Sequence, residues 1–229
     1  GQPARSATAD AAALSTQLQQ ALNADDNVEA LSALMDPDQA ATLLDSFRRF
    51  SSRFPVTRWR VSPGEATEDG RPTVKLAVTG TRQQDGLSYS FRAYQRLALS
   101  TTAGLITGQQ VLSDQSVMTS AKKPLPISLM IPDTVLTGSR YDVDVVVDEP
   151  LGKALLAGGL TAVTPEQVLV QKSPIIQLAP LGGGGLFKSV QAPFQPGVQT
   201  WAALLVHPDG VITVSKQVQV VDDRQQLMP

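Results

Sequence analysis

The chain changes its residue pattern near Pro124, and this change limits the folds that it can adopt. Before Pro124, an Ala-, Leu- and Gln-rich segment with helical spacing leads into segments in which apolar and polar residues alternate. After Pro124, short alternating segments follow one another, and Pro or Gly separates nearly all of them. We therefore predict two domains of different class, because 229 residues are enough to build two hydrophobic cores.

The N-terminal quarter of the chain has the three- and four-residue spacing of amphipathic helices. Leu14, Leu18 and Leu22 mark a first helix, and Leu31 and Met35 lie on one face of a second. A third helix is expected over 40–54, ending before a proline. The sequence thus predicts three helices ahead of the first strand.

Beyond this segment the apolar residues recur at every second position, which is typical of β-strands with one buried face. Strands are expected around residues 58–61, 73–79, 89–99 and 105–118. Asp85-Gly86 is a turn signal between two of these strands. Short connections favour an antiparallel meander, with the helices covering one face.

Three helices followed by a four-stranded antiparallel meander over 8–121 resemble the NTF2-like (cystatin-like) α+β cone. The resemblance implies an α+β domain, a pocket between helices and sheet, and a possible homodimer through this domain. Trp59, Gln95, Gln109 and either Tyr89 or Tyr94 would line the pocket. Enzymes of the family use a pocket Asp with Tyr, His or another acid. No Asp or Glu of this chain falls clearly on an inward position, so we favour a filled or apolar pocket and assign no catalytic residue.

Residues 122–126 contain two prolines and are interpreted as a short, stiff linker. Over 127–222 we expect about seven short strands, which predict an all-β sandwich. They include 127–131, 141–147, 160–163, 186–190, 198–206 and 211–221. The stretch from Phe187 through Trp201 to the Asp209-Gly210 hairpin resembles an immunoglobulin-like or fibronectin-III-like module. Residues 223–229 are expected to form a frayed tail.

The composition excludes several classes of site. The chain has no cysteine, which excludes disulfides, thiolate catalysis and cysteine-ligated metals. The net charge is −2, so no global field attracts nucleic acid, and we expect a protein partner or a small apolar ligand. The longest apolar runs are far shorter than the roughly 20 residues that a membrane helix needs. No cofactor is expected.

The individual motifs of the chain do not indicate a particular reaction. His207 is the chain's single histidine and lies in a turn, while Gly182–Gly185 lacks the spacing of a phosphate-binding loop. Asp142, Asp144, Asp148 and Glu149 are the densest acidic group, but they lack the pattern of a calcium loop, so no metal site is predicted.

Arginines and aromatic residues are interleaved over 47–60, which is the chain's main basic-aromatic concentration. Arg48, Arg49 and Arg53 are the candidates there for docking an acidic partner.

We expect a non-enzymatic, exported bacterial protein that serves as a binding or assembly module. The start, Gly1-Gln2-Pro3, lacks Met, as would follow removal of a targeting segment, and an extracytoplasmic location is expected. One alternative is an NTF2-like enzyme, an isomerase, dehydratase or hydrolase acting on a small apolar substrate. A second alternative is a structural spacer in a cell-envelope complex.

Overall fold

The computed structural model describes residues 2–42, 44–45, 56–121, 126–149, 156–163, 176–181, 184–208 and 210–227. The chain forms two compact units. Unit 1 comprises Gly1–Arg82, Phe91–Asp114 and Met228–Pro229, and unit 2 comprises Gln83–Ser90 and Gln115–Leu227. Strand β4 (Leu105–Ala121) therefore contributes residues to both units.

Unit 1 begins with helix α1 (Gln2–Asn23), followed by the shorter helix α2 (Asn27–Ser32). The leucines that recur at helical spacing in α1 are buried, and they pack into one hydrophobic core with Leu31 and Met35. Residues 40–42 and 44–45 are also helical, and the remainder of the predicted third helix lies outside the described residues. No helix in the described part of the chain has the length and apolar character needed to cross a membrane.

The sheet of unit 1 has the strand order β1 (Val56–Pro63), β2 (Thr73–Gln84), β3 (Leu87–Thr102) and β4. The predicted turn at Asp85-Gly86 joins β2 to β3, and Ala103-Gly104 joins β3 to β4. All four turn residues have positive φ angles, between 53° and 80°. Two-residue turns of this kind match the twist of the strands that they connect, and glycine adopts such angles without strain.

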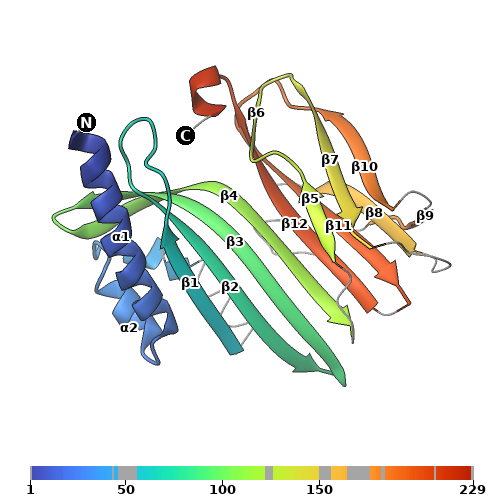
Figure 1. Ribbon diagram of the computed structural model, residues 1–229, viewed down its shortest axis with the longest axis horizontal. Helices are drawn as coiled ribbons and strands as arrows, with labels where there is room; N and C mark the ends of the chain where they lie inside the picture. Colours follow the sequence, from blue (N-terminus) through green and yellow to red (C-terminus); the bar gives the residue numbers. More distant parts are fainter. Residues whose placement is uncertain are drawn as a thin grey trace. The chain divides into compact units, whose positions relative to one another are not determined.

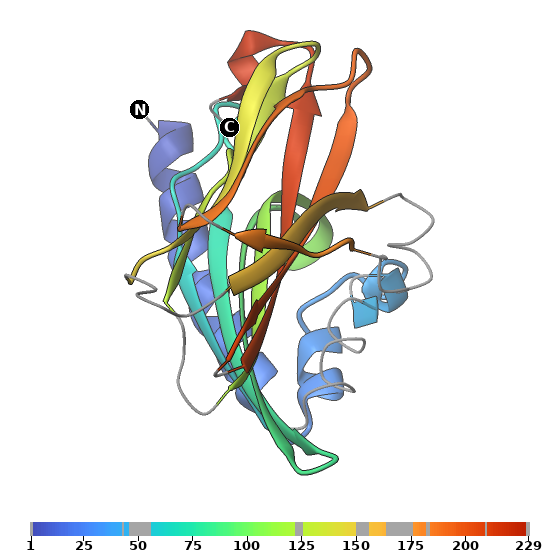
Figure 2. The same ribbon diagram turned by 90° about the vertical axis from the view of Figure 1, so that its right-hand side faces the viewer.

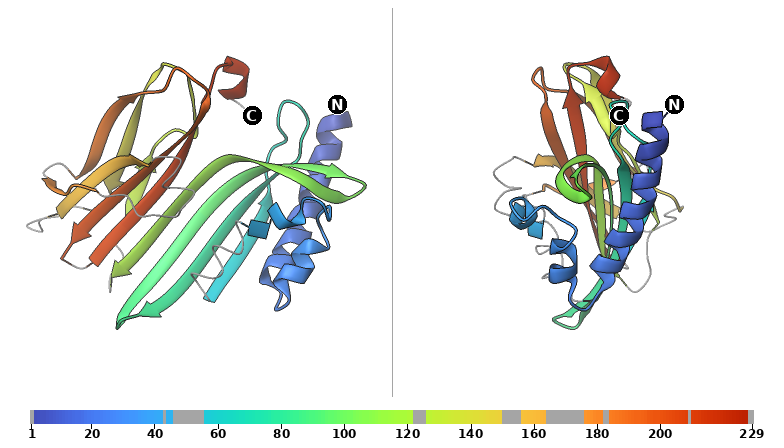
Figure 3. Two further views of the ribbon diagram at one scale, coloured as in Figure 1. Left: turned by 180° about the vertical axis from the view of Figure 1, so that it is seen from behind. Right: turned by 90° about the vertical axis from the view of Figure 1, so that its left-hand side faces the viewer.

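Helix α1 lies beside strand β1 (Figure 1, Figure 3). Two side chains of this helix form hydrogen bonds with the backbone at the outer edge of the strand. The Asn23 amide accepts a hydrogen bond from the Trp59 N–H at 2.9 Å and donates one to the Trp59 carbonyl at 2.8 Å. The Gln19 side-chain oxygen accepts a hydrogen bond from the Val61 N–H at 2.9 Å. These two amides pair with backbone groups as a further strand would, which protects an edge that could otherwise bind other chains.

Unit 2 is a β-sandwich of two sheets (Figure 1, Figure 2). One sheet contains β12 (Gly210–Val221), β11 (Gly197–His207), β8 (Leu156–Val163) and β9 (Ala179–Leu181) in that order. Residues 115–121 of β4 pair with β12 in antiparallel register, and β6 (Thr134–Leu136) pairs with β12 in parallel. The other sheet has the order β10 (Gly185–Gln191), β7 (Arg140–Val147) and β5 (Ile127–Met130). The 3-10 helix η1 (Arg224–Leu227) follows β12.

A lysine lies on the core face of the sandwich. Lys216 lies on the same face of β12 as the buried Val214 and Val218, and its side chain is 3% exposed. Its ammonium forms an ion pair with Asp133, whose side chain is 44% exposed. The valines before and after Lys216 belong to different hydrophobic clusters, so the lysine marks where one cluster ends and the next begins.

The prediction of an NTF2-like α+β first domain is wrong. Strands account for 59% of the structure and helices for 17%, so the protein is predominantly β, with large antiparallel sheets. The helical spacing of the N-terminal quarter is real, but this segment is a small part of the chain. The predicted four-stranded sheet is also not self-contained, because residues 115–121 of β4 pair with β12 in unit 2.

The immunoglobulin-like or fibronectin-III-like prediction is wrong for a related reason. A self-contained module over 127–222 would end its sheet at β12, but β4 continues that sheet beyond β12. The coarser prediction of a β-sandwich agrees with the two sheets of unit 2. Among the predicted strands, those at 141–147, 186–190, 198–206 and 211–221 are present as β7, β10, β11 and β12.

Candidate functional site: a basic sheet face

The residues predicted to line a pocket come from strands β1, β3 and β4. Trp59 is buried in the core of unit 1. Gln95 lies on the core-facing side of β3, the same side as Trp59, whereas Tyr94 lies on the opposite face. Gln109 is exposed on β4, and Tyr89 lies near the start of β3. By the same alternation Tyr89 lies on the face of Phe91 and Gln95, so Tyr89 and not Tyr94 is on the side of Trp59.

Arg48, Arg49 and Arg53 lie outside the described residues. His207 ends β11, and Asp142 and Asp148 are exposed. Within the described ranges, His, Asp and Glu side chains form no group of three or more that could hold a metal ion.

The outstanding feature of unit 1 is the charge of its first three strands. Strands β1, β2 and β3 contain no Asp or Glu. Their basic residues are Arg58 and Arg60 on β1, Lys75 and Arg82 on β2, and Arg92 and Arg96 on β3. Three adjacent strands therefore carry positive charge with no carboxylate among them.

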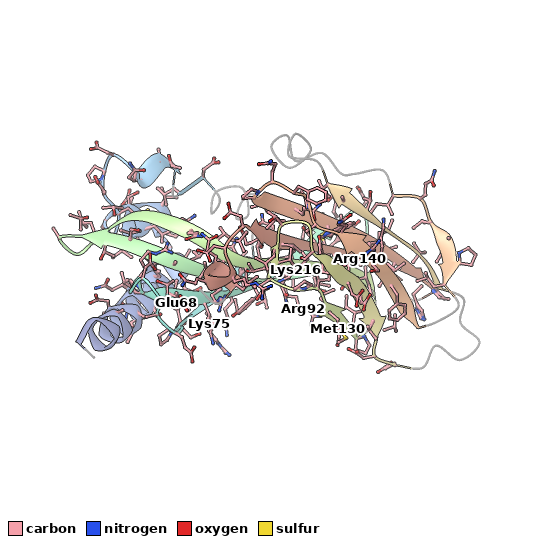
Figure 4. The ribbon with its side chains drawn as sticks, turned by 90° about the horizontal axis from the view of Figure 1, so that it is seen from above. Glu68, Lys75, Arg92, Met130, Arg140 and Lys216 are labelled. Atoms are coloured by element: carbon pink, nitrogen blue, oxygen red, sulfur yellow. The ribbon has the colours of Figure 1, made fainter. Side chains whose placement is uncertain are left out.

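Strand alternation places five of these cations on the face opposite the hydrophobic core. Arg58 and Arg60 flank the buried Trp59, and Lys75 lies between the buried Val74 and Leu76. On β3, Phe91, Ala93 and Leu97 belong to the core, so the intervening arginines point away from it. We call this surface the basic face and define it as Arg58, Arg60, Lys75, Arg92 and Arg96; Figure 4 shows Lys75 and Arg92.

The cations of the basic face are available to a partner. Arg58, Arg60, Lys75 and Arg92 are exposed, and none of them forms an ion pair within the described part of the chain. Arg96 is half-buried, and its Nε atom is buried without a hydrogen-bond partner among the described residues. Among the residues that the structure describes, no carboxylate therefore neutralises these guanidinium and ammonium groups.

In the loop that connects β1 to β2, an arginine is paired with a carboxylate. Arg71 donates from Nε to both oxygens of Asp69, at 3.1 and 3.0 Å, and from Nη1 to Gln110 at 2.7 Å. The hydrogen bond from Thr67 and then those from Arg71 lower the pKa of the Asp69 carboxyl. Glu68 of the same connection is exposed (Figure 4). Arg71 is therefore occupied by Asp69 of its own loop and by Gln110 of β4, unlike the cations of the basic face.

The pairing register of β1 and β2 keeps the cations of the two strands from lying directly opposite one another. Arg58 lies opposite Thr79, Arg60 opposite Ala77, and Lys75 opposite Ser62. Each cation thus faces a small, neutral residue on the neighbouring strand, which limits repulsion between like charges. Residues two apart on a strand are separated by about 6.7 Å, so Arg58 and Arg60 present a regular ladder of charge. This arrangement suits the binding of several anionic groups at once.

The signal for the basic face was present in the sequence. Arg58 and Arg60 belong to the predicted basic-aromatic concentration, but the more distant Lys75, Arg92 and Arg96 were not joined to them. Alternation of cations with core residues in three successive strands, together with the lack of carboxylates there, would have predicted the shared face.

Comparison with known proteins gives one family match. Residues 122–221 match a family model described as "Domain of unknown function (DUF8623)". No curated protein matches the chain. The family match falls in unit 2 and spans less than half of the chain, so it describes a similarity of that part and assigns no activity.

Proposed function

We propose that this protein is a non-enzymatic binding or assembly module whose basic face docks an acidic surface of a protein partner. One observation carries the proposal: five cations lie on one face of three adjacent strands that contain no carboxylate. Four of these cations are exposed. Surfaces without a binding role usually mix charges of both signs, because a field of one sign repels itself.

The chemistry of the face favours an acidic protein surface over nucleic acid. Proteins that bind single-stranded nucleic acid combine cations with several aromatic side chains on which bases stack. On the basic face Tyr94 is the one aromatic residue from β1, β2 and β3, and the small Ala77 and Thr79 lie between the cations. A carboxylate-bearing protein surface needs only the spaced cations.

The test uses fluorescently labelled poly-L-glutamate as an acidic polypeptide probe, in low salt and at about 0.3 M salt. Arg60→Glu reverses one charge of the basic face. Arg224→Glu is the matched control, because Arg224 is exposed in η1 and the change in net charge is identical. We expect at least tenfold weaker binding for Arg60→Glu and less than twofold for the control. Circular dichroism establishes that both variants are folded.

Two results would overturn the proposal. Equal weakening by both substitutions would mean that the probe senses net charge and not the basic face. Tighter binding of a single-stranded oligonucleotide than of poly-L-glutamate at the same salt would replace the acidic protein partner by nucleic acid.

A further inference from the structure

A second exposed sheet face lies in unit 2, on the three-stranded sheet β10-β7-β5. Met130 and Phe187 both lie opposite Asp144 in the strand register, so the three side chains form one row across the sheet. Met130 is 63% exposed and Phe187 is 59% exposed, although the core face of the same sheet is well buried. Phe and Met are enriched in protein-binding surfaces, and neighbouring exposed apolar side chains mark such surfaces.

The same face carries a ladder of carboxylates along β7 and its continuation. Asp142, Asp144 and Asp148 alternate with the buried Val143, Val145 and Val147, so they lie on the outer side. The Ser128 hydroxyl donates to both oxygens of Asp148, at 2.9 and 2.8 Å, which holds that carboxylate above the sheet. We call this surface the acidic face and define it as Met130, Asp142, Asp144, Asp148 and Phe187; Figure 4 labels Met130.

Arg140 is the cation on the outer side of β7, at the end of the strand away from Asp148. Lys188 of β10 lies opposite Val143, on the core side of the sheet, and its Nζ is 5.5 Å from the centre of the Trp201 ring. The outer side of β7 therefore has an excess of negative charge.

The acidic face and the basic face are complementary in charge and in spacing. Asp142 and Asp144 are two residues apart on a strand, as are Arg58 and Arg60, so both ladders repeat at about 6.7 Å. The exposed Phe187 ring beside Asp144 offers a surface on which a guanidinium can stack while it pairs with the carboxylate.

We propose that the acidic partner of the basic face is a second copy of this chain. The acidic face in unit 2 of one copy docks on the basic face in unit 1 of the next. This inference rests on the proposed function and identifies its partner.

The two docking faces differ, so the contact is heterologous, and a pair of copies keeps one free basic face on one copy and one free acidic face on the other. Such contacts build rings when the rotation between copies closes, and open chains when it does not. A symmetric contact between two basic faces would bring like charges together, which opposes a twofold arrangement through this surface.

The interface is small. The eight residues of β7 extend over about 26 Å, and three strands span roughly 10–14 Å, which gives a face of a few hundred Å². Stable complexes bury about 800 Å² on each partner, and exposed ion pairs contribute little each. Self-association should therefore be weak, dependent on concentration and sensitive to salt.

Sedimentation velocity of the full chain, from about 10 µM to 1 mM and at low and high salt, tests this inference. The variant Arg58→Ser/Arg60→Ser neutralises the basic face, and Asp142→Ser/Asp144→Ser neutralises the acidic face. We expect species larger than the monomer for the wild type in low salt, and at least a tenfold loss of association for each variant alone. An equimolar mixture of the two variants retains one functional pair of faces, so it should form a heterodimer that does not grow further.

Some outcomes separate this inference from the proposed function. A wild-type chain that stays monomeric at 1 mM in low salt would overturn self-assembly. So would unchanged association of the Asp142→Ser/Asp144→Ser variant. If the chain nevertheless binds poly-L-glutamate and loses that binding with Arg60→Glu, the proposed function stands with a different acidic partner. Loss of both properties would refute both proposals.

Discussion

Removal of the Asn23 side chain tests whether α1 holds the sheet of unit 1 through its edge strand. Asn23 makes two hydrogen bonds of 2.8 and 2.9 Å with the backbone of Trp59, whose residue is 8% exposed. A neutral hydrogen bond contributes about 1 kcal/mol net, and a buried polar group that loses its partner costs about 1–3 kcal/mol. The gain in helix propensity from Asn to Ala offsets only a few tenths of this amount. We therefore expect Asn23→Ala to lower the free energy of unfolding by about 2–3 kcal/mol.

Urea unfolding followed by circular dichroism measures this change. Gln17→Ala is the matched control, because Gln17 is exposed on the same helix. Asn23→Asp provides a second comparison: it keeps the acceptor for the Trp59 N–H but places a carboxylate oxygen against the Trp59 carbonyl. It should be at least as destabilising as Asn23→Ala. If Asn23→Ala stays within about 0.5 kcal/mol of the control, the side-chain amide does not hold the edge strand and the reasoning fails.

Two further predictions concern polar groups in the core of unit 2. Asp133→Ala should destabilise the protein by about 2 kcal/mol, because the buried Lys216 ammonium loses its carboxylate, whereas Lys216→Met should stay within about 1 kcal/mol of wild type. Thermal unfolding compares the two variants, and an equal or larger loss for Lys216→Met would contradict this account.

Tyr141 accepts a hydrogen bond from the Trp201 indole N–H at 2.9 Å and donates one to Gln199 at 2.5 Å. Burial raises the pKa of the Tyr141 hydroxyl, while the Trp201 hydrogen bond partly opposes the rise. The native state therefore holds this proton more tightly than the unfolded state. Its contribution is complete below the unfolded pKa of about 10 and declines as the pH rises above it. Urea midpoints above pH 9.5 should fall more steeply for wild type than for Tyr141→Phe; parallel curves would exclude this linkage.

Local patterns located much of the secondary structure. The alternation of Val74, Leu76 and Val78 with polar residues predicted both the strand and its buried face. Asp85-Gly86 predicted the turn, because few residues adopt the positive φ angles that it requires. These features depend on contacts within a few residues, which a single stretch of sequence contains.

Pairing between distant segments was not predicted. Residues 115–121 of β4 pair with 210–216 of β12, and this pairing removed the boundary that the predicted fold class required. Lys216 falls on the core side of its strand by alternation alone, but its partner Asp133 is 83 residues away in the chain. Alternation shows which face a residue occupies and does not show which strand lies beside it.

The sequence by itself determined where the strands of unit 1 run, which of their side chains face the core, and that three of them carry cations without carboxylates. The predicted meander already made these strands neighbours, whereas only the tertiary structure decided the register that places the cations from Arg58 to Arg96 across one face. The same holds for Met130, Asp144 and Phe187, which come from three different strands. The physical reason is that the spacing of apolar residues and the residue preferences of turns involve only a few neighbouring residues. Strand pairing across the whole sheet depends on which partners together bury the most apolar surface.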